Sequence, residues 1–316
     1  MPTARAAIQD RVVFWGAVLV ICTGFFLAYI PSLPWQEPRL SLTDLMAGTA
    51  HRPFVHRVFV PAVVRLAMMV APLPAEVYAA GLIYLFFVGF VLSMERLARH
   101  FWPLPIIPQV VALAALPALG PLTLTHKHVY DIGTLFFFTL SLEEMAQRRW
   151  GRFLLAFTLS CLNKETALLL TLIFGACFWT VLDRARFWRL TLLQLGIYLA
   201  LRAVLIWVFR DNPGGEVEYR LGDQLASIIN SPAATAAQWV FGLFVLRLIS
   251  WRWAAKPAFL RRAAWAVTPP LLVLYGLFGY PFEIRVFYEA FPILFLLSAP
   301  TLGRYSGLDF FAAPPA

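Results

Sequence analysis

Apolar runs of about 20 residues recur along the whole chain, and they limit its possible folds more than any other feature. The runs cover 12–30, 77–94, 106–124, 130–142, 153–162, 166–182, 187–209, 233–250, 263–279 and 286–301. A helix of about that length spans the hydrocarbon of a bilayer, because it pairs all its own backbone groups. We therefore predict an all-α fold, a polytopic transmembrane helical bundle with about 9–10 membrane helices.

Composition agrees with this class, since 60% of the 316 residues are hydrophobic and only 14% are charged. No hydrophilic stretch is long enough for a soluble domain, so we expect a single integral membrane domain over 1–316. Its predicted parts are a first helix at 12–30, an outer loop with interfacial helices at 31–76, a helical bundle at 77–301 and a cytoplasmic tail at 302–316.

Basic residues give the chain a net charge of +9, but they lie in short loops between apolar runs. In that position they orient helices and face membrane lipids, so nucleic acid is not an expected partner. Arg5 and Arg11 precede the first run, which predicts an uncleaved helix with a cytoplasmic N-terminus in a cell (inner) membrane protein. The three cysteines lie inside apolar runs and show no disulfide or metal spacing.

The segment 54–70 decides the topology. It is apolar but contains His56, Arg57 and Arg65. We expect it to lie in the interface as an amphipathic helix, with a full crossing as the alternative. The interfacial placement puts the arginine-rich connectors between later apolar runs in the cytoplasm. It also makes 153–162 and 166–182 a hairpin, too short to span the bilayer twice without tilt or re-entry.

Basic residues in cytoplasmic loops are accounted for by the orientation of the helices in the membrane. The remaining polar clusters all fall on the extracytoplasmic face in this topology. They are Glu37 to Arg57 in the first loop, His126 to Asp131, Asn163 to Thr166, Arg210 to Arg220, and Glu283 to Glu289. Charges beside hydrocarbon are costly and usually functional. His56, His128, Glu283 and Arg285, which belong to these clusters, are therefore candidate substrate-binding residues.

The sequence Leu162-Asn-Lys-Glu-Thr166 interrupts a long apolar run, Phe153 to Leu182, with adjacent opposite charges. Asn163 is predicted to cap the following helix, which would put Lys164 and Glu165 in its first turn. A helix N-terminus beside a lysine suits a phosphate or carboxylate. The alternative is a solvated corner between two short helices, without a role in binding.

Two other clusters allow more than one interpretation. The His126, His128 and Asp131 group could join His51, His56 and Glu165 in a metal site, but no spaced ligand pair such as HExxH is present, and no metal ligand is assigned. Arg285 and Glu289 have the i,i+4 spacing of an internal ion pair, which is as compatible with a structural role as with a catalytic one.

The segment Glu143-Glu144-x-x-x-Arg148 matches the first motif of intramembrane CAAX-type proteases. That family also needs histidine motifs further along the chain, and no histidine follows His128, so this class of enzyme is excluded.

The order of features resembles the GT-C superfamily of polytopic glycosyltransferases, over about residues 10–185. The resemblance lies in the first helix and acidic outer loop, the basic turn Glu95-Arg-Leu-Ala-Arg99, Tyr130-Asp131 before an apolar helix, and the lysine turn at Leu162–Thr166. It departs from the pattern because the first loop has no Asp-Glu pair, Glu165 replaces a glycine after Lys164, and no large soluble domain follows.

The resemblance implies transfer of a sugar from a polyprenyl-phosphate donor to a lipid, glycan or protein acceptor. Asp44, on a short helix expected to start at Ser41, would be the base, with Glu37 as the alternative. Lys164, Asn163 and Arg57 would hold the lipid phosphate. Asp131 and Glu165 would orient substrates or bind a divalent cation, and the cofactor is otherwise unknown.

Two other classes of function are compatible with the chain. A transporter or flippase would also use broken helices facing an anionic substrate, but it predicts internal repeats that the sequence lacks, and polar residues on both sides of the midplane. The crowding of polar residues on one face favours an enzyme. A non-catalytic membrane assembly subunit is the third class, and it would tolerate changes at Asp44 or Lys164.

Overall fold

The computed structural model describes residues 4–104, 106–123, 127–215 and 217–311, and within them it confirms the predicted all-α class. Thirteen α-helices and several short 3-10 helices make up the regular structure there, with no strand beyond one isolated bridge. The α-helices are α1 (Ala4–Tyr29), α2 (Leu42–Ala47), α3 (Phe59–Val70), α4 (Ala75–Phe101), α5 (Ile107–Leu119), α6 (Asp131–Ala146), α7 (Trp150–Asn163), α8 (Leu169–Phe178), α9 (Arg184–Val208), α10 (Leu221–Asn230), α11 (Pro232–Ser250), α12 (Ala258–Phe278) and α13 (Phe291–Tyr305).

Four helical stretches are long and apolar enough to cross a membrane: Asp10–Ser32, Ala75–Phe101, Arg184–Val208 and Pro232–Ser250. Much of their surface faces outward, and α11 has no buried residue. Large exposed apolar surfaces are uncommon on soluble monomers. The molecule is therefore compatible with a membrane protein.

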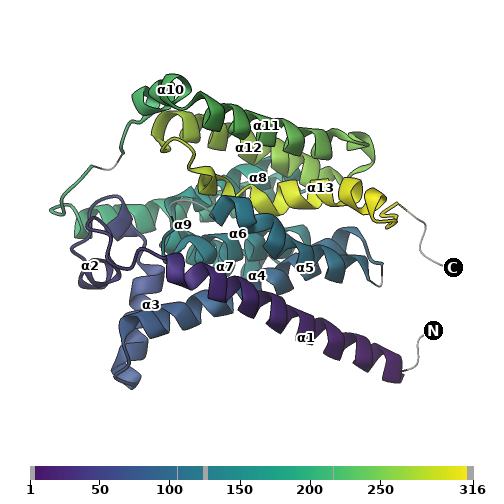
Figure 1. Cartoon of the computed structure of the whole chain (residues 1–316), viewed down its shortest axis with the longest axis horizontal. Coiled ribbons are helices and arrows are strands. Elements are labelled where there is room, and N and C mark those ends of the chain that lie inside the picture. The colour runs from purple at the N-terminus through teal and green to yellow at the C-terminus, as the bar shows by residue number, and fades with distance from the viewer. Residues whose placement is uncertain (1–3, 105, 124–126, 216, 312–316) are drawn as a thin grey trace.

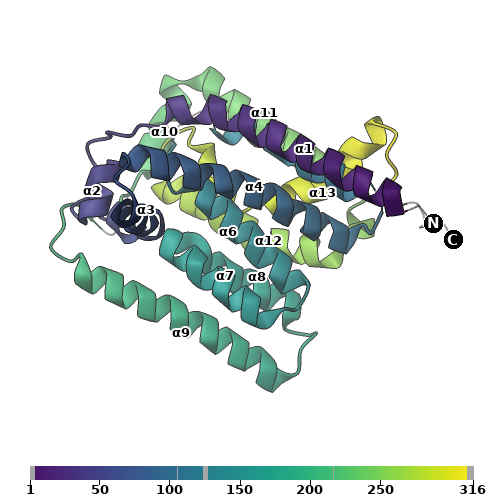
Figure 2. The same cartoon turned by 90° about the horizontal axis from the view of Figure 1, so that it is seen from below.

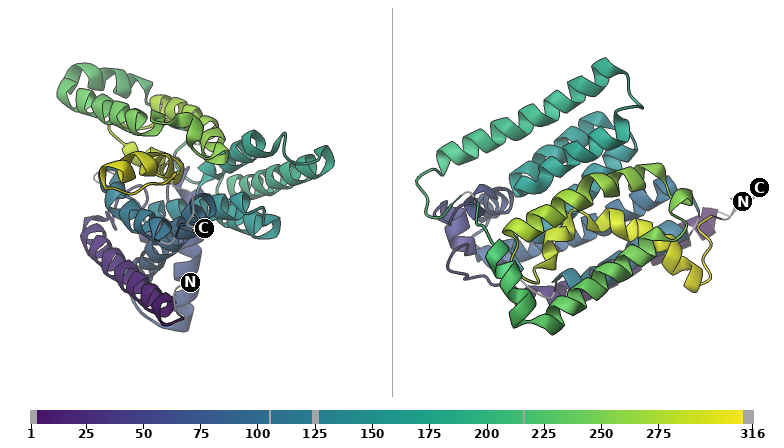
Figure 3. Two further views of the ribbon diagram at one scale, coloured as in Figure 1. Left: turned by 90° about the vertical axis from the view of Figure 1, so that its right-hand side faces the viewer. Right: turned by 90° about the horizontal axis from the view of Figure 1, so that it is seen from above.

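The long helices run roughly side by side, with α4 and α6 in the middle of the bundle (Figures 1 and 2). α4 contacts α1, α5 and α6, while α6 packs on α7 and α12 packs on α8. α9 lies along one side of the bundle, and α10 and α11 cover another (Figure 3). Phenylalanine rings fill the centre, as where Phe59 meets Phe137 edge-on at 4.8 Å.

One end of the bundle, called the α3 end below, carries α2 and α3 (Figures 1 and 2). α3 stands at a steep angle to α4 there, and its 12 residues reach about 18 Å. That is well short of a hydrocarbon core of about 30 Å. α3 is therefore too short to cross such a core on its own, and the interfacial placement of 54–70 stays a prediction.

The opposite end, called the arginine-rich end, gathers the basic connectors. Arg186, at the start of α9, lies over Trp150 at the start of α7, and Phe101 at the end of α4 stacks on Phe259 at the start of α12. α13 runs to Tyr305, within the predicted tail. Phe310 is also buried there, against Trp102.

The predicted hairpin corresponds to α7 and α8, which are joined by Lys164 and the 3-10 helix η4 (Glu165–Leu168). The helices run antiparallel, since Trp150 at the start of α7 packs against Phe174 and Phe178 near the end of α8. At 14 and 10 residues they reach only about 21 and 15 Å. The hairpin turn therefore lies at the α3 end, and both arms are shorter than a bilayer core.

A close approach between α4 and α6 supplies a test of the packing. A Cβ at Gly89 would lie 2.6 Å from the Phe136 ring, whereas one at Gly81, on the same helix, would meet nothing within 4 Å. We expect Gly89→Ala to destabilise the protein by about 1–3 kcal/mol through overpacking. Gly81→Ala should be neutral or stabilising, because alanine favours helix over glycine. Unfolding of both variants in detergent measures the difference, and equal behaviour would contradict the α4–α6 contact.

Candidate functional site

Four segments that lie far apart in sequence meet at the α3 end and form a group of paired charges, called the polar cluster. It consists of Arg57, Tyr130, Asp131, Lys164, Glu165, Glu283, Arg285 and Glu289. These residues come from the loop before α3, the start of α6, the α7–α8 turn and the segment before α13. Sequence analysis predicted that these segments share one face, and the structure brings them into direct contact.

Arg57 and Glu165 form the most complete ion pair of the cluster. Arg57 donates from Nη2 to Oε1 of Glu165 at 2.8 Å and from Nε to Oε2 at 3.3 Å, which is a two-pronged contact. Arg57 also donates to the hydroxyl of Tyr130 and lies over its ring. Burial raises the pKa of Glu165, but the charge and hydrogen bonds of Arg57 outweigh burial and bring that pKa down to about 2. The carboxylate is therefore ionised at neutral pH.

Asp131 begins α6 and is held from two sides. It accepts from the backbone N–H of His128 at 2.9 Å and from Nη1 of Arg285 at 3.1 Å. Arg285 also donates to Glu283, which accepts from the backbone N–H of Tyr280 at 2.9 Å. Asp131 is only 1% exposed, so the bridge by Arg285 keeps its charge compensated in the interior.

Lys164 pairs with Glu289 at 2.9 Å, and Glu289 also accepts from the hydroxyl of Thr166. The predicted Arg285–Glu289 pair is therefore wrong, because each of the two residues has another partner. The reason is local geometry. Residues 284–288 form a 3-10 helix, in which positions i and i+3 are eclipsed, so i,i+4 neighbours do not lie on the same side.

The predicted capping role of Asn163 is also wrong. Asn163 is the last residue of α7, Lys164 is extended, and no side chain caps the following 3-10 helix. Asn163 is fully buried and instead donates to the carbonyl of Tyr130 at 3.0 Å and to Oγ1 of Thr134 at 2.8 Å. A Cβ at Gly133 would come within 2.9 Å of its Oδ1, so a glycine there makes room for it. Asn163 thus holds α7 against α6, and no capped helix N-terminus forms an anion site.

The proposed base, Asp44, takes part in a different interaction. Ser41 caps α2 as predicted, accepting from the backbone N–H of Asp44 and donating to its carboxylate at 2.6 Å. Thr49 donates to the same carboxylate at 3.4 Å. Among the described residues, no contact joins Asp44 to the polar cluster. Glu37, the alternative base, lies 3.7 Å from Nδ1 of His128 and so adjoins the cluster through Asp131.

His56 precedes Arg57 of the polar cluster in the chain. It is buried, its ring lies near Phe209, and its Nδ1 is 3.2 Å from Nη2 of Arg202. Arg202 lies deep within an apolar run, where a charged side chain needs a polar partner. Its contact with His56 links α9 to the loop before α3.

The polar cluster as built does not fit a divalent cation. No group of three or more His, Cys, Asp or Glu side chains is arranged to hold a metal in the ranges that the structure covers, and His126 lies outside them. Both proposed carboxylate ligands have basic partners, since Arg285 holds Asp131 and Arg57 holds Glu165. No metal-dependent step is therefore assigned to these residues.

The charge balance limits what the polar cluster can bind. Its ion pairs join three basic side chains to four carboxylates, so it carries no excess of positive charge. An anionic ligand must replace a carboxylate on one of the basic groups. Glu165 is 28% exposed, whereas Glu289 is fully buried, so Glu165 is the easier of the two to displace.

Comparisons with known proteins leave the chain without an assigned family, since no protein-family model, curated protein or solved structure matches it. The site is therefore judged by its geometry. Sequence analysis missed Tyr130 as a partner of Arg57, and Glu289 as the partner of Lys164. Both residues lay within the polar segments it had singled out, but nothing in their spacing indicated these partners.

The Arg57–Glu165 pair leads to a stability prediction. Glu165→Gln leaves Arg57, which is 8% exposed, without its carboxylate, and should destabilise the protein by about 3–5 kcal/mol. Glu218→Gln breaks pairs that are more exposed and should cost less than about 1 kcal/mol. Unfolding midpoints in detergent measure both. Replacing Arg57 and Glu165 together with methionine should recover most of the loss. No recovery in the double variant would mean that the broken Arg57–Glu165 pair is not the cause of the destabilisation.

The pKa of Glu165 predicts how this loss depends on pH. The folded value of about 2 lies below the ordinary value of 4.5, so ionised Glu165 stabilises the fold above pH 4.5. The stabilisation declines as pH falls from 4.5 toward 2. The stability difference between the wild type and Glu165→Gln should therefore be constant at neutral pH and shrink over this acidic range. A difference that stays unchanged down to pH 2.5 would contradict the pairing.

Proposed function

We propose that the bundle spans a cell membrane with its N-terminus in the cytoplasm and the polar cluster at the extracytoplasmic face. In support, four helices have the length and composition to cross, and the basic connectors gather at the end opposite α3. The 21-residue α12 and the shorter helices α5, α6, α7, α8 and α13 would bring the membrane-embedded helices to about ten.

The proposed activity is transfer of a sugar from a polyprenyl-phosphate donor to a lipid, glycan or protein acceptor. One observation carries it: basic and acidic side chains from four distant segments converge in one largely buried group at a single end of the bundle. Burying this many charges costs stability, so their presence calls for a reason other than folding. Charged groups at membrane depth are usually functional. The short motifs shared with the GT-C superfamily support the choice of reaction.

In this mechanism the donor phosphate takes the place of Glu165 on Arg57. Arg57 presents Nε and Nη2 as a fork, a geometry that suits phosphate as well as carboxylate. The exchange keeps the buried guanidinium paired throughout, so binding does not leave a bare charge. Arg57 then stabilises the negative charge that develops on the leaving phosphate. Lys164, held by Glu289, lies next to Glu165 in the chain and adds to the local potential.

The acceptor hydroxyl needs a base, and the contacts favour Glu37 over Asp44. Glu37 is 36% exposed and lies beside His128, whereas Asp44 is hydrogen-bonded within its own short helix. A base must reach the hydroxyl that it deprotonates, and a carboxylate at the edge of the cluster can do so. Asp131 and Arg285 would position the substrates rather than transfer protons, because each is already engaged by a charged partner.

A transporter or flippase for an anionic or lipid-linked substrate is the second candidate. The observation in its favour is the broken hairpin, in which the extended Lys164 separates two half-length arms. Transporters commonly bind substrates at such breaks. Unlike a transferase, a flippase would move a polyprenyl-phosphate sugar between leaflets without releasing the sugar, so product analysis in proteoliposomes distinguishes the two.

The base assignment gives the decisive variants for the transferase. Purified protein in proteoliposomes is supplied with polyprenyl-phosphate sugars of several kinds and a membrane extract as acceptor, and sugar transfer is measured. We expect Glu37→Gln to lower the rate about 100- to 10,000-fold, the range for losing a general base. Asp44→Asn should keep most of the activity.

Arg39→Gln serves as the control, because Arg39 is exposed in the same loop and pairs only loosely with Glu218 at 3.7 Å. It should retain wild-type transfer. An inactive Asp44→Asn with an active Glu37→Gln would reverse the base assignment. If no donor is consumed by the wild type while labelled lipid still crosses the bilayer, the flippase replaces the transferase.

A further inference from the structure

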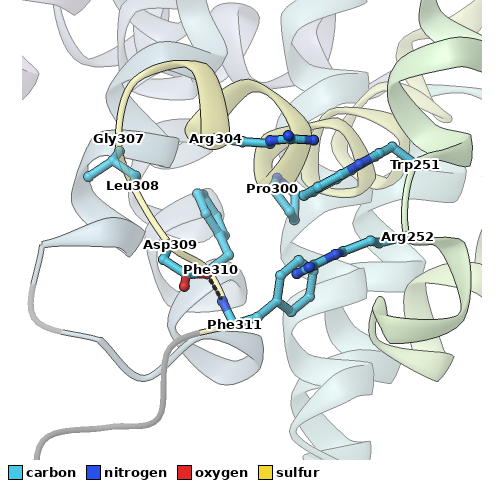
Figure 4. Close-up of a pocket in the computed structure, with 9 residues that line it drawn as sticks. All are labelled: Trp251, Arg252, Pro300, Arg304, Gly307, Leu308, Asp309, Phe310 and Phe311. Carbon is cyan, nitrogen blue, oxygen red and sulfur yellow. Dashed lines mark hydrogen bonds between the residues drawn. The ribbon is translucent and has the colours of Figure 1, made fainter.

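The arginine-rich end contains an open hollow of about 480 Å³, lined in part by Trp251, Arg252, Arg304 and Phe311 (Figure 4). It lies where α11 and α13 end together, since Thr301 donates to the carbonyl of Leu248 at 2.6 Å. The hollow is remote from the polar cluster in the fold, so the glycosyltransferase proposal assigns no role to it.

Two arginines flank one indole ring in this hollow. The guanidinium of Arg252 lies 5.2 Å from the centre of the Trp251 ring and that of Arg304 lies 5.4 Å from it (Figure 4). Arg252 also lies over Phe311 at 5.7 Å. Aromatic faces attract cations, so contact with the Trp251 ring stabilises both guanidiniums at the cavity wall.

Neither guanidinium has a carboxylate partner within the described ranges. Asp309 belongs to the same wall, but its Oδ1 accepts from the backbone N–H of Phe311 at 2.9 Å, which ties it to its own turn. The arrangement contrasts with the polar cluster, where every arginine has a carboxylate. Two unpaired guanidiniums on one aromatic platform leave their donors directed at an external anion, and arginine forks match phosphate geometry.

A second hollow, of about 340 Å³, is also lined by tryptophan and arginine. It is lined by Trp253, Ala258, Arg261, Arg262 and Trp265. Trp265 is 72% exposed, although it is large and largely apolar. Tryptophan and arginine side by side are typical of the level of lipid headgroups, where the ring stays in the interface and the charge meets phosphate. The surroundings therefore indicate a lipid as the source of the anion.

From this geometry we propose that the hollow at Trp251, Arg252 and Arg304 binds the phosphate of an anionic phospholipid headgroup. The two guanidiniums hold the phosphate, Trp251 orients them, and the apolar rings of Phe310 and Phe311 border the glycerol region. The proposal rests on the membrane assignment and is independent of the enzymatic one.

The test measures the apparent Kd of phosphatidylglycerol for the full chain in detergent by native mass spectrometry. A cationic side chain near an anionic lipid contributes about fivefold in affinity, so Arg304→Gln should weaken binding about fivefold and Arg252→Asn with Arg304→Gln about 25-fold. Asparagine is chosen at position 252 because Arg252 has a φ of 46°, which asparagine tolerates. Arg304 lies exposed in the last turn of α13, so its single variant tests the site even if the double variant misfolds.

Arg184→Gln with Arg189→Gln is the matched control, because it removes two exposed arginines from α9 without touching the hollow. Its affinity should stay close to that of the wild type. An equal loss in the control would overturn the proposal in favour of general charge attraction. Phosphatidylcholine should bind more weakly than phosphatidylglycerol, and equal binding would overturn the role of charge. Displacement of the lipid by millimolar inorganic phosphate would identify a free anion as the ligand and overturn the lipid assignment.

Discussion

The buried ion pair between Arg57 and Glu165 is the interaction on which the α3 end depends. Its partners are separated by 108 positions in the chain, so the pair joins the first loop to the turn of the α7–α8 hairpin. A guanidinium with 8% exposure needs a carboxylate close by, because an uncompensated buried charge is strongly destabilising. Tyr130 lies in the same contact and connects the pair to the start of α6. The position of α3 follows from this anchor, since Arg57 lies only two residues before Phe59, where α3 begins.

Much of the fold could be predicted because membrane-like helices are encoded locally. Apolar length sets the extent of helices such as α9 and α11, and the 12-residue length of α3 leaves it out of the four helices long enough to cross a membrane. The convergence of the polar segments could also be predicted, because charged side chains are excluded from hydrocarbon and gather at its ends.

Which side chains pair with one another within the polar cluster could not be predicted. Asn163 ends one helix just before another segment begins, and at such a junction the sequence of a helix end looks like that of a cap. Only the packing of α7 on α6 sends its side chain toward Tyr130.

Charge balance shapes the proposed chemistry more than any single residue does. A lysine or arginine in the sequence invites assignment as an anion site, but here every cluster cation already has a carboxylate. A ligand phosphate must therefore compete, and the outcome depends on the exposure of the resident carboxylate. Glu165 meets that condition and Glu289 does not. The proposed exchange on Arg57 would also account for a glutamate after Lys164, because that side chain keeps the arginine paired in the absence of donor.

The two ends of the bundle handle arginine in opposite ways, and the difference follows from their surroundings. At the α3 end the guanidiniums of Arg57 and Arg285 are nearly buried, so the protein must supply their counterions. At the arginine-rich end Arg252 and Arg304 lie open beside Trp251, where the solvent or the membrane can supply the counterion instead. A headgroup bound there would fix the depth of α11 and α13, whose ends meet at this hollow. Glu289, the partner of Lys164, lies two residues before α13 begins, so anchoring one end of that helix would also restrain the polar cluster at the other.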